Sequence, residues 1–244
     1  GPSVPHGSGM ITDTRVERHK TLYGTHNFTK GPAMSREQAV QALETGIRLA
    51  MEKKEEGYKI LATGEMGIGN TTTSSAMASV FLGRPAEELT GRGAGLSSEG
   101  LNRKINAIRQ AILRNQPDPE DPVDVLAKVG GFDIAGMAGV FLGGAAMHMP
   151  VVIDGFISCV AALTAMRLCP QAADYMMASH VSREPAAGML LGAIGKEAFL
   201  TCDMCLGEGS GAIMLFPLLD MGLEVYNRMA TFEENDIETY VPLS

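Results

Sequence analysis

A glycine-rich turn at residues 64–70, Gly-Glu-Met-Gly-Ile-Gly-Asn, has a composition suited to phosphate binding. Because Gly67 and Gly69 lack side chains, backbone N–H groups can approach a phosphate closely, and the start of a following helix adds partial positive charge. Asn70 stands where a Walker loop needs lysine, and the glycine spacing is not that of a dinucleotide fingerprint. Close packing of a helix on a strand requires similar glycines, so a structural role stays open.

Two acidic residues are the next candidates for chemistry. Asp154 follows the hydrophobic run 150–153, and a carboxylate at the end of a buried strand suits the hydroxyl groups of a ribose. Capping of the next helix is the alternative role for Asp154. Glu208 lies between two glycines in apolar sequence, where burial of a carboxylate is costly unless something compensates it. This favours a general base, with capping of a helix that starts near Ser210 as the alternative.

Hydrophobic periodicity predicts the elements that would position these residues. Ser35 is a helix N-cap with Gln38 at the capping-box position, and the strand-like run 58–62 leads into the glycine turn. The predicted helices span residues 35–57, 71–81, 98–113, 158–168 and 210–229, and the predicted strands span 58–62 and 150–153. Strand, glycine turn and helix in succession predict an α/β fold with a parallel sheet, whose ligands bind at the carboxyl ends of the strands.

The overall charge and one uncharged segment argue against two classes of protein. A formal net charge of −8 over 244 residues argues against nucleic-acid binding, which normally requires a basic face. Residues 134–153 carry no formal charge and are long enough to cross a bilayer, but they contain His148, Pro150 and a run of small residues. We therefore predict a buried helix followed by a buried strand there, and no membrane span.

The cysteines and the first thirty residues suggest no additional site. Cys202 and Cys205 form a single C-x-x-C, whereas a zinc site would need a second ligand pair that is not visible. Nothing that resembles a secretory signal precedes them, so reduced thiols in the cytoplasm, with buried packing roles and no metal or cofactor, are expected. Residues 1–30 show little hydrophobic periodicity and are predicted to form an extended segment ahead of an α/β domain at 31–244.

Five segments together resemble the nicotinate-nucleotide–dimethylbenzimidazole phosphoribosyltransferase family, which assembles the nucleotide loop of cobamides. The segments are residues 31–35 (GPAMS), 64–72 (GEMGIGNTT), 128–133 (KVGGFD), 152–158 (VIDGFIS) and 206–212 (LGEGSGA). The resemblance runs from about residue 15 to the end, and several segments in the family's order are far more specific than any one. It implies a Rossmann-like parallel sheet flanked by helices in three layers, and a homodimer.

The resemblance also implies a reaction. The phosphoribosyl group of nicotinate mononucleotide would pass to 5,6-dimethylbenzimidazole or a related base, giving α-ribazole 5′-phosphate and nicotinate. Glu208 matches the family's catalytic base, Asp154 and Gly93 would line the ribose and nicotinate region, and Lys104 and Ser182 would assist phosphate binding. The implied substrate-binding residues are Glu65, Met66, Gly67, Ile68, Gly69, Asn70, Thr71, Gly93, Lys104, Asp154, Ser182 and Gly207.

One departure from the family leaves three interpretations. The family's chains are considerably longer, and their N-terminal part, which forms a small domain and much of the base pocket, has no counterpart here. The chain is then a transferase catalytic domain, a nucleotide-binding module without turnover, or a homologue that attaches another base such as adenine or a phenol. Release of nicotinate that depends on an added base would separate the first interpretation from the second.

Overall fold

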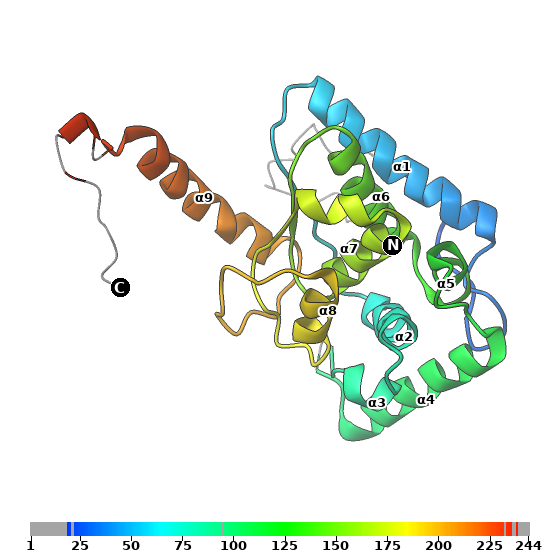
Figure 1. Cartoon of the computed structure of the whole chain (residues 1–244). Coiled ribbons are helices and arrows are strands. Elements are labelled where there is room, and N and C mark those ends of the chain that lie inside the picture. Colours follow the sequence, from blue (N-terminus) through cyan, green and yellow to red (C-terminus); the bar gives the residue numbers. More distant parts are fainter. Residues whose placement is uncertain (1–18, 21, 94, 232, 236–237, 239–244) are drawn as a thin grey trace, which may run out of the picture.

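The computed structural model describes residues 19–238 except 21, 94, 232, 236 and 237, and it has an α/β fold rich in helix (Figure 1). The α helices are α1 (Arg36–Glu55), α2 (Asn70–Leu82), α3 (Ala86–Leu89), α4 (Ser98–Asn115), α5 (Pro122–Val129), α6 (Phe132–Ala146), α7 (Phe156–Leu168), α8 (Ala187–Ile194) and α9 (Ser210–Arg228). The strands are β1 (Leu61–Ala62), β2 (Val151–Ile153) and β3 (Met176–Ala178), and two 3-10 helices are η1 (Pro170–Tyr175) and η2 (Glu233–Asn235). The predicted α/β class is therefore confirmed.

The three strands form one parallel sheet in the order β1-β2-β3. Leu61 pairs with Val151, and Val151 pairs in turn with Met176. Strands that follow one another in the chain therefore lie side by side, and helices connect them. The predicted strand at 58–62 is shorter than expected, because β2 is only three residues long and gives β1 partners at two positions. The parallel arrangement brings the carboxyl ends of all three strands to one edge of the sheet.

Alternation along β2 sends its side chains to two separate clusters. Val151 and Ile153 belong to the main core, which α1, α2, α6 and α7 help to build, whereas Val152 packs with Ala212 and Leu215 of α9. Helices thus lie on both faces of the sheet, as the three-layer expectation requires. Only the start of α9 takes part, because the rest of this helix extends away from the body (Figure 1).

The predicted helix boundaries agree with the structure to within about two residues. The Ser35 and Gln38 capping box is present at the start of α1, and the uncharged segment 134–153 forms most of α6 and then β2. Sequence patterns did not predict β3 or the short helices α3, α5 and α8. No helix within the described residues is long and apolar enough to cross a membrane. Residues 1–18 of the predicted extended segment lie outside the description.

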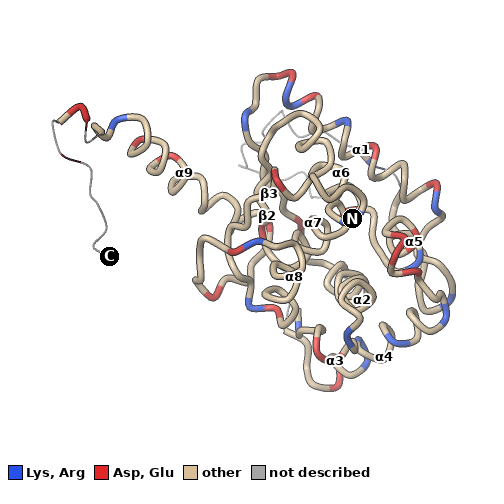
Figure 2. The backbone as a smooth tube through the Cα atoms, viewed as in Figure 1, with Lys and Arg blue, Asp and Glu red and all other residues tan. Residues whose placement is uncertain are grey.

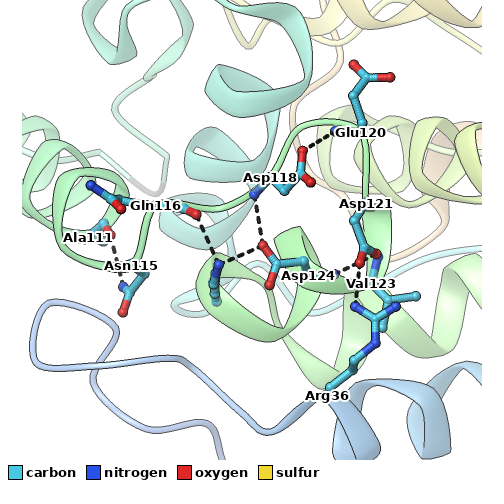
Figure 3. Close-up of polar contacts among 10 residues, drawn as sticks. Arg36, Ala111, Asn115, Gln116, Asp118, Glu120, Asp121, Val123 and Asp124 are labelled. Carbon is cyan, nitrogen blue, oxygen red and sulfur yellow. Dashed lines mark hydrogen bonds and ion pairs between the residues drawn. The ribbon is translucent and has the colours of Figure 1, made fainter.

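Charged side chains lie mainly on peripheral elements such as α1 and α4, whereas the central helices are largely free of them (Figure 2). The connection between α4 and α5 shows how such groups order a loop (Figure 3). Asp121 caps α5 by accepting from the N–H groups of Val123 and Asp124, each at 3.1 Å, and it pairs with Arg36 of α1 at 2.6 Å. The Arg36 guanidinium holds the pKa of Asp121 below its usual value. Asp121 therefore attaches α5 to the start of α1.

Glycines let α1 and α6 pack with their backbones in contact. A Cβ at Gly46 of α1 would collide with the carbonyl oxygen of Gly136 and lie 2.8 Å from the amide nitrogen of Val140. A Cβ at Gly143 of α6 would lie 2.7 Å from the carbonyl oxygen of Ile47. Side chains larger than hydrogen are therefore excluded along this contact, which supports the core beneath the sheet.

Replacing Gly46 by Ala should destabilise the fold by about 1–3 kcal/mol, because the methyl group must force the two helices apart. Urea unfolding followed by circular dichroism measures this effect. Gly136→Ala is the matched control on α6, since a Cβ there meets no atom within 4 Å. The control should be neutral or stabilising by up to about 1 kcal/mol, given the helix propensity of alanine. Equal midpoints for both variants would contradict the proposed close approach.

Candidate active site

A cavity of about 190 Å³ lies beside the carboxyl edge of the sheet, where the residues following β1, β2 and β3 meet. Its walls come from the glycine turn, the starts of α2 and α7, the segment after β3 and the loop before α9. The lining residues are Glu65, Met66, Gly67, Ile68, Thr71, Gly93, Gly155, Phe156, Ile157, His180, Ser182, Glu184, Cys205, Leu206 and Gly207. The predicted position of the ligand site agrees with this cavity.

The loop before α9 has an unusual backbone. Gly207, Glu208 and Gly209 have φ values of 76°, 60° and 77°, so a glutamate occupies the left-handed region between two glycines. The Glu208 N–H donates to the carbonyl oxygen of Glu65 at 2.9 Å, which holds the loop against the glycine turn. A Cβ on Gly64 would lie 2.5 Å from the amide nitrogen of Gly209. Backbone contact therefore joins the two motifs, and a left-handed non-glycine residue is a feature that clusters at functional sites.

Asp154 fixes the start of α9. Its carboxylate accepts hydrogen bonds from the N–H groups of Gly209 at 3.1 Å, Gly211 at 2.8 Å and Ala212 at 3.0 Å. The residue is only 1% exposed and does not line the cavity. The structure thus favours a capping role over ribose binding, and the capped helix is α9 rather than the adjacent α7. A local sequence pattern cannot indicate this partner, because Gly209 lies 55 residues after Asp154 in the chain.

A polar network lies behind the glycine turn. Glu65 Oε2 accepts from the Gly67 N–H and from Asn70 Nδ2, and the same amide group of Asn70 donates to Asp133 Oδ2 at 2.8 Å. Burial raises the pKa of the half-buried Glu65 carboxyl against these hydrogen bonds, and the negative charges of Asp133 and Asp154 add to the rise. The Gly67 amide, predicted to bind phosphate, is therefore already engaged by Glu65.

The start of α2 carries the features expected of an anion site. Its N-cap, Gly69, has a φ of 83° and makes no side-chain capping bond. Lys104 of α4 lies nearby, with Nζ 3.1 Å from Thr71 Oγ1 and 3.0 Å from the carbonyl oxygen of Gly91. Burial lowers the pKa of Lys104, and the carboxylate of Glu184 opposes this. An uncapped helix start with a lysine beside it attracts a phosphate group.

Two of the predicted site residues contrast in their exposure, and one of them departs from expectation. Glu208 is exposed, so the premise of a buried carboxylate is wrong; the neighbouring side chains do not cover it. Lys104 is 7% exposed and lies beside Thr71 and Gly93 rather than on the surface. Among the predicted residues, those that line the cavity are Glu65, Met66, Gly67, Ile68, Thr71, Gly93, Ser182 and Gly207.

A second, larger cavity of about 530 Å³ adjoins the first and shares Glu65, Met66 and Ile68 with it. It lies between α1, α6 and the glycine turn, and its lining includes apolar side chains of both helices. Asn70 lines this cavity and not the first one. The glycine turn is therefore a wall between two spaces, one at the strand ends and one against the helices.

Sequence reasoning missed two polar groups of the first cavity and misjudged the cysteines. His180 and Glu184 alternate with Ser182 along an extended segment, a spacing that could have indicated a common face. Cys202 and Cys205 are exposed, and Cys205 lines the cavity, so a buried packing role is wrong for this pair. No group of three or more His, Cys, Asp or Glu side chains in the described part of the chain is arranged to hold a metal ion.

Replacing Asp154 by Ala should destabilise the protein by roughly 3 kcal/mol, because three buried backbone donors lose a charged acceptor. Urea unfolding measures the change. Asp220→Ala, on the exposed part of α9, is the control and should change stability by less than about 0.5 kcal/mol. If the two variants unfold at the same urea concentration, the Asp154 bonds do not hold α9 in solution.

Comparison with known proteins gives one consistent result. The phosphoribosyltransferase family model matches residues 5–237. The nicotinate-nucleotide–dimethylbenzimidazole phosphoribosyltransferase of Ruminiclostridium cellulolyticum is 50% identical over 228 residues, which are 93% of this chain and 65% of the relative. That of Acetivibrio thermocellus is 49% identical over 227 residues, again 93% and 65%.

A solved structure has the same fold. The crystal structure of CobT from Thermus thermophilus superposes with a TM-score of 0.87 at 39% identity, covering 94% of this chain and 69% of that one. This chain spans about 65% of the length of the first two relatives. From the family match and these similarities, the chain belongs to the phosphoribosyltransferase family.

Proposed function

We propose that the chain carries the site that transfers the phosphoribosyl group of nicotinate mononucleotide to 5,6-dimethylbenzimidazole, giving α-ribazole 5′-phosphate and nicotinate. The observation that supports this most is that the start of α2, through Thr71, and the left-handed loop, through Gly207, line one cavity, while Lys104 bonds to Thr71 behind its wall. The relatives named above bear the name of this reaction. In this proposal, residues 31–244 form the catalytic α/β domain.

The nucleotide would lie in the smaller cavity with its phosphate at the start of α2. The amides there and the Lys104 ammonium supply positive charge, and Ser182 on the opposite segment supplies a hydroxyl. Because the Gly67 amide is engaged by Glu65, we assign phosphate binding to the amides of Ile68 and Thr71, the residues of this turn and helix start beyond Gly67 that line the smaller cavity.

The acceptor base would lie at the junction of the two cavities. Met66, Ile68 and Leu206 are 68%, 74% and 68% exposed, so the mouth of the smaller cavity has an apolar rim. An aromatic base that covered these side chains would remove apolar surface from water and would also shield Glu208. Glu208 is exposed, so its carboxylate is accessible to an aromatic ring bound at this rim.

The reaction then requires that the two substrates be correctly positioned and that one group accept a proton. One ring nitrogen of the benzimidazole attacks C1′ of the ribose from the face opposite nicotinate, so the configuration inverts from β to α. Nicotinate leaves readily because cleavage of the bond neutralises its pyridinium nitrogen. The other ring nitrogen loses its proton to Glu208, which the Glu65 carbonyl and the flanking glycines hold in place.

We further infer that the protein acts as a homodimer in the cytoplasm. The exposed part of α9 carries large apolar side chains, which supports a partner on this helix; they include Met221, Leu223, Val225 and Tyr226. The four unpaired cysteines fit a reducing compartment.

Replacing Glu208 by Gln should lower base-dependent release of nicotinate by about 10²–10⁴-fold, since an amide cannot take the proton. Nucleotide affinity, measured by calorimetry, should change little. Glu197→Gln, at another exposed position, is the control and should keep the full rate. A Glu208 variant with the wild-type rate would exclude this residue as the catalytic base. Release of nicotinate without an added benzimidazole would contradict transfer to that acceptor.

Replacing Lys104 by Gln should weaken binding of nicotinate mononucleotide by roughly 10-fold, because a charge-assisted hydrogen bond to phosphate is lost. Affinity for nicotinate riboside, which has no phosphate, should stay nearly constant, so the ratio of the two dissociation constants isolates the phosphate contribution. Lys59→Gln removes an exposed charge and controls for the change in net charge. Equal losses for both ligands would place the phosphate elsewhere.

A further inference from the structure

The segment after β3 presents alternate side chains to the smaller cavity. His180, Ser182 and Glu184 line the cavity, whereas Val181 packs against the main core. His180 forms a parallel bridge with Leu200, which keeps this part of the segment extended. Ser182 has a proposed role at the phosphate, but His180 has no role in the reaction described so far.

The imidazole of His180 is held in one orientation by its surroundings. A Cβ on Gly211 would collide with Nδ1 and Cε1, and a Cβ on Gly155 would lie 3.9 Å from Nε2. The ring is therefore enclosed between the starts of α9 and α7. These two glycines leave the space that the ring fills, and the residue is only 4% exposed.

A hydrogen bond to Ser179 determines which ring nitrogen carries the proton. The Ser179 hydroxyl donates to the carbonyl oxygen of Ile153 at 2.7 Å, so its oxygen is free to accept. It lies 3.0 Å from Nδ1 of His180, and the bond therefore requires a hydrogen on Nδ1. In a neutral ring, Nε2 is then left with a lone pair.

The neutral ring is favoured by its environment. Burial lowers the pKa of His180, although the nearby Asp154 carboxylate acts in the opposite direction. Asp154 is itself occupied by three backbone N–H groups. The start of α7, which lies at the cavity, also disfavours a positive charge. Among the described residues, Nε2 has no hydrogen-bond partner. It is also not one of the fully enclosed polar atoms that lack a partner, so it is not sealed off from the cavity. It is therefore an acceptor open to the cavity.

We propose that Nε2 of His180 accepts a hydrogen bond from a ribose hydroxyl of the nucleotide, so that His180 distinguishes ribose from deoxyribose. The inference rests on the function proposed above. In nicotinate mononucleotide with a doubly ionised phosphate, the carboxylate, the phosphate and the pyridinium ring have no N–H or O–H group. The two ribose hydroxyls are therefore the donors that such an acceptor can recognise.

Two substitutions at one position test this assignment. His180→Asn keeps a donor near Nδ1 for Ser179 but places no group at Nε2, whereas His180→Gln restores an acceptor near Nε2. Calorimetry would measure binding of nicotinate mononucleotide and of its 2′-deoxy and 3′-deoxy analogues to the wild-type chain and both variants. Thermal unfolding would establish that each variant is folded.

We expect the wild type to bind one deoxy analogue about 10-fold more weakly than the nucleotide. His180→Asn should bind the nucleotide about 10-fold more weakly and lose the discrimination, and His180→Gln should recover most of both. Unchanged discrimination in a folded His180→Asn protein would overturn the assignment. If the wild type binds the nucleotide and both deoxy analogues equally well, the His180 assignment is wrong but the proposed function stands. If the wild type binds no nucleotide, both the assignment and the proposed function are wrong.

A measurement on the wild-type protein tests the proposal even if a variant does not fold. In the wild type labelled with ¹⁵N at histidine, the unprotonated ring nitrogen of His180 should shift toward the value of a hydrogen-bonded nitrogen when the nucleotide is added. The deoxy analogue that binds weakly should not produce this shift at saturation. An unchanged nitrogen resonance in the saturated nucleotide complex would overturn the proposal.

Discussion

The carboxylate of Asp154 accepts three backbone hydrogen bonds from the start of α9, and the site is assembled around this interaction. It joins the end of the central strand to a helix that begins more than fifty residues later. The loop that contains Glu208 precedes this helix and leans on the glycine turn through a backbone bond to Glu65. One buried acceptor therefore sets the distance between two motifs that the chain encodes far apart. The cost of burying the charge is offset because each of its bonds comes from an otherwise unpaired helix amide.

Glycine also brings distant segments together, because it lets backbones touch where side chains would separate them. Gly46 and Gly143 bring α1 and α6 together beneath the sheet, and Gly64 brings the first turn against Gly209. Gly211 leaves room for the His180 ring. Some of the abundant glycines thus serve close contacts in the core, and others form the turns at the candidate site. Such contacts leave little freedom for the position of a catalytic group.

The long helices and the central strand could be predicted from periodicity and capping, as α1 with Ser35 and Gln38 illustrates. Strand β3 could not, because its sequence Met-Met-Ala lacks the β-branched residues of β2 and it follows a 3-10 helix that opens with a proline. Residues of both glycine motifs line the first cavity. Sequence alone gave the wrong surroundings for Glu208 and the wrong helix for Asp154, since exposure and distant capping depend on how elements pack. His180 was missed because its alternation with Ser182 and Glu184 is a weak pattern, and its tautomer depends on contacts with Ser179 that only the folded structure shows.

The shared wall between the two cavities has a thermodynamic consequence. Glu65 faces both spaces, and its carboxylate also binds the Gly67 amide at the head of the turn. A ligand in either space that alters the charge or orientation of this carboxylate changes the free energy of binding in the other. Linkage requires the effect to be mutual, so whatever factor a ligand in one space imposes on the affinity for a ligand in the other, the second imposes on the first. Burial and the charges of Asp133 and Asp154 raise the pKa of Glu65, so the ionised form of this carboxyl group is sensitive to its surroundings. Occupancy of the two spaces would thus be coupled through one carboxyl group.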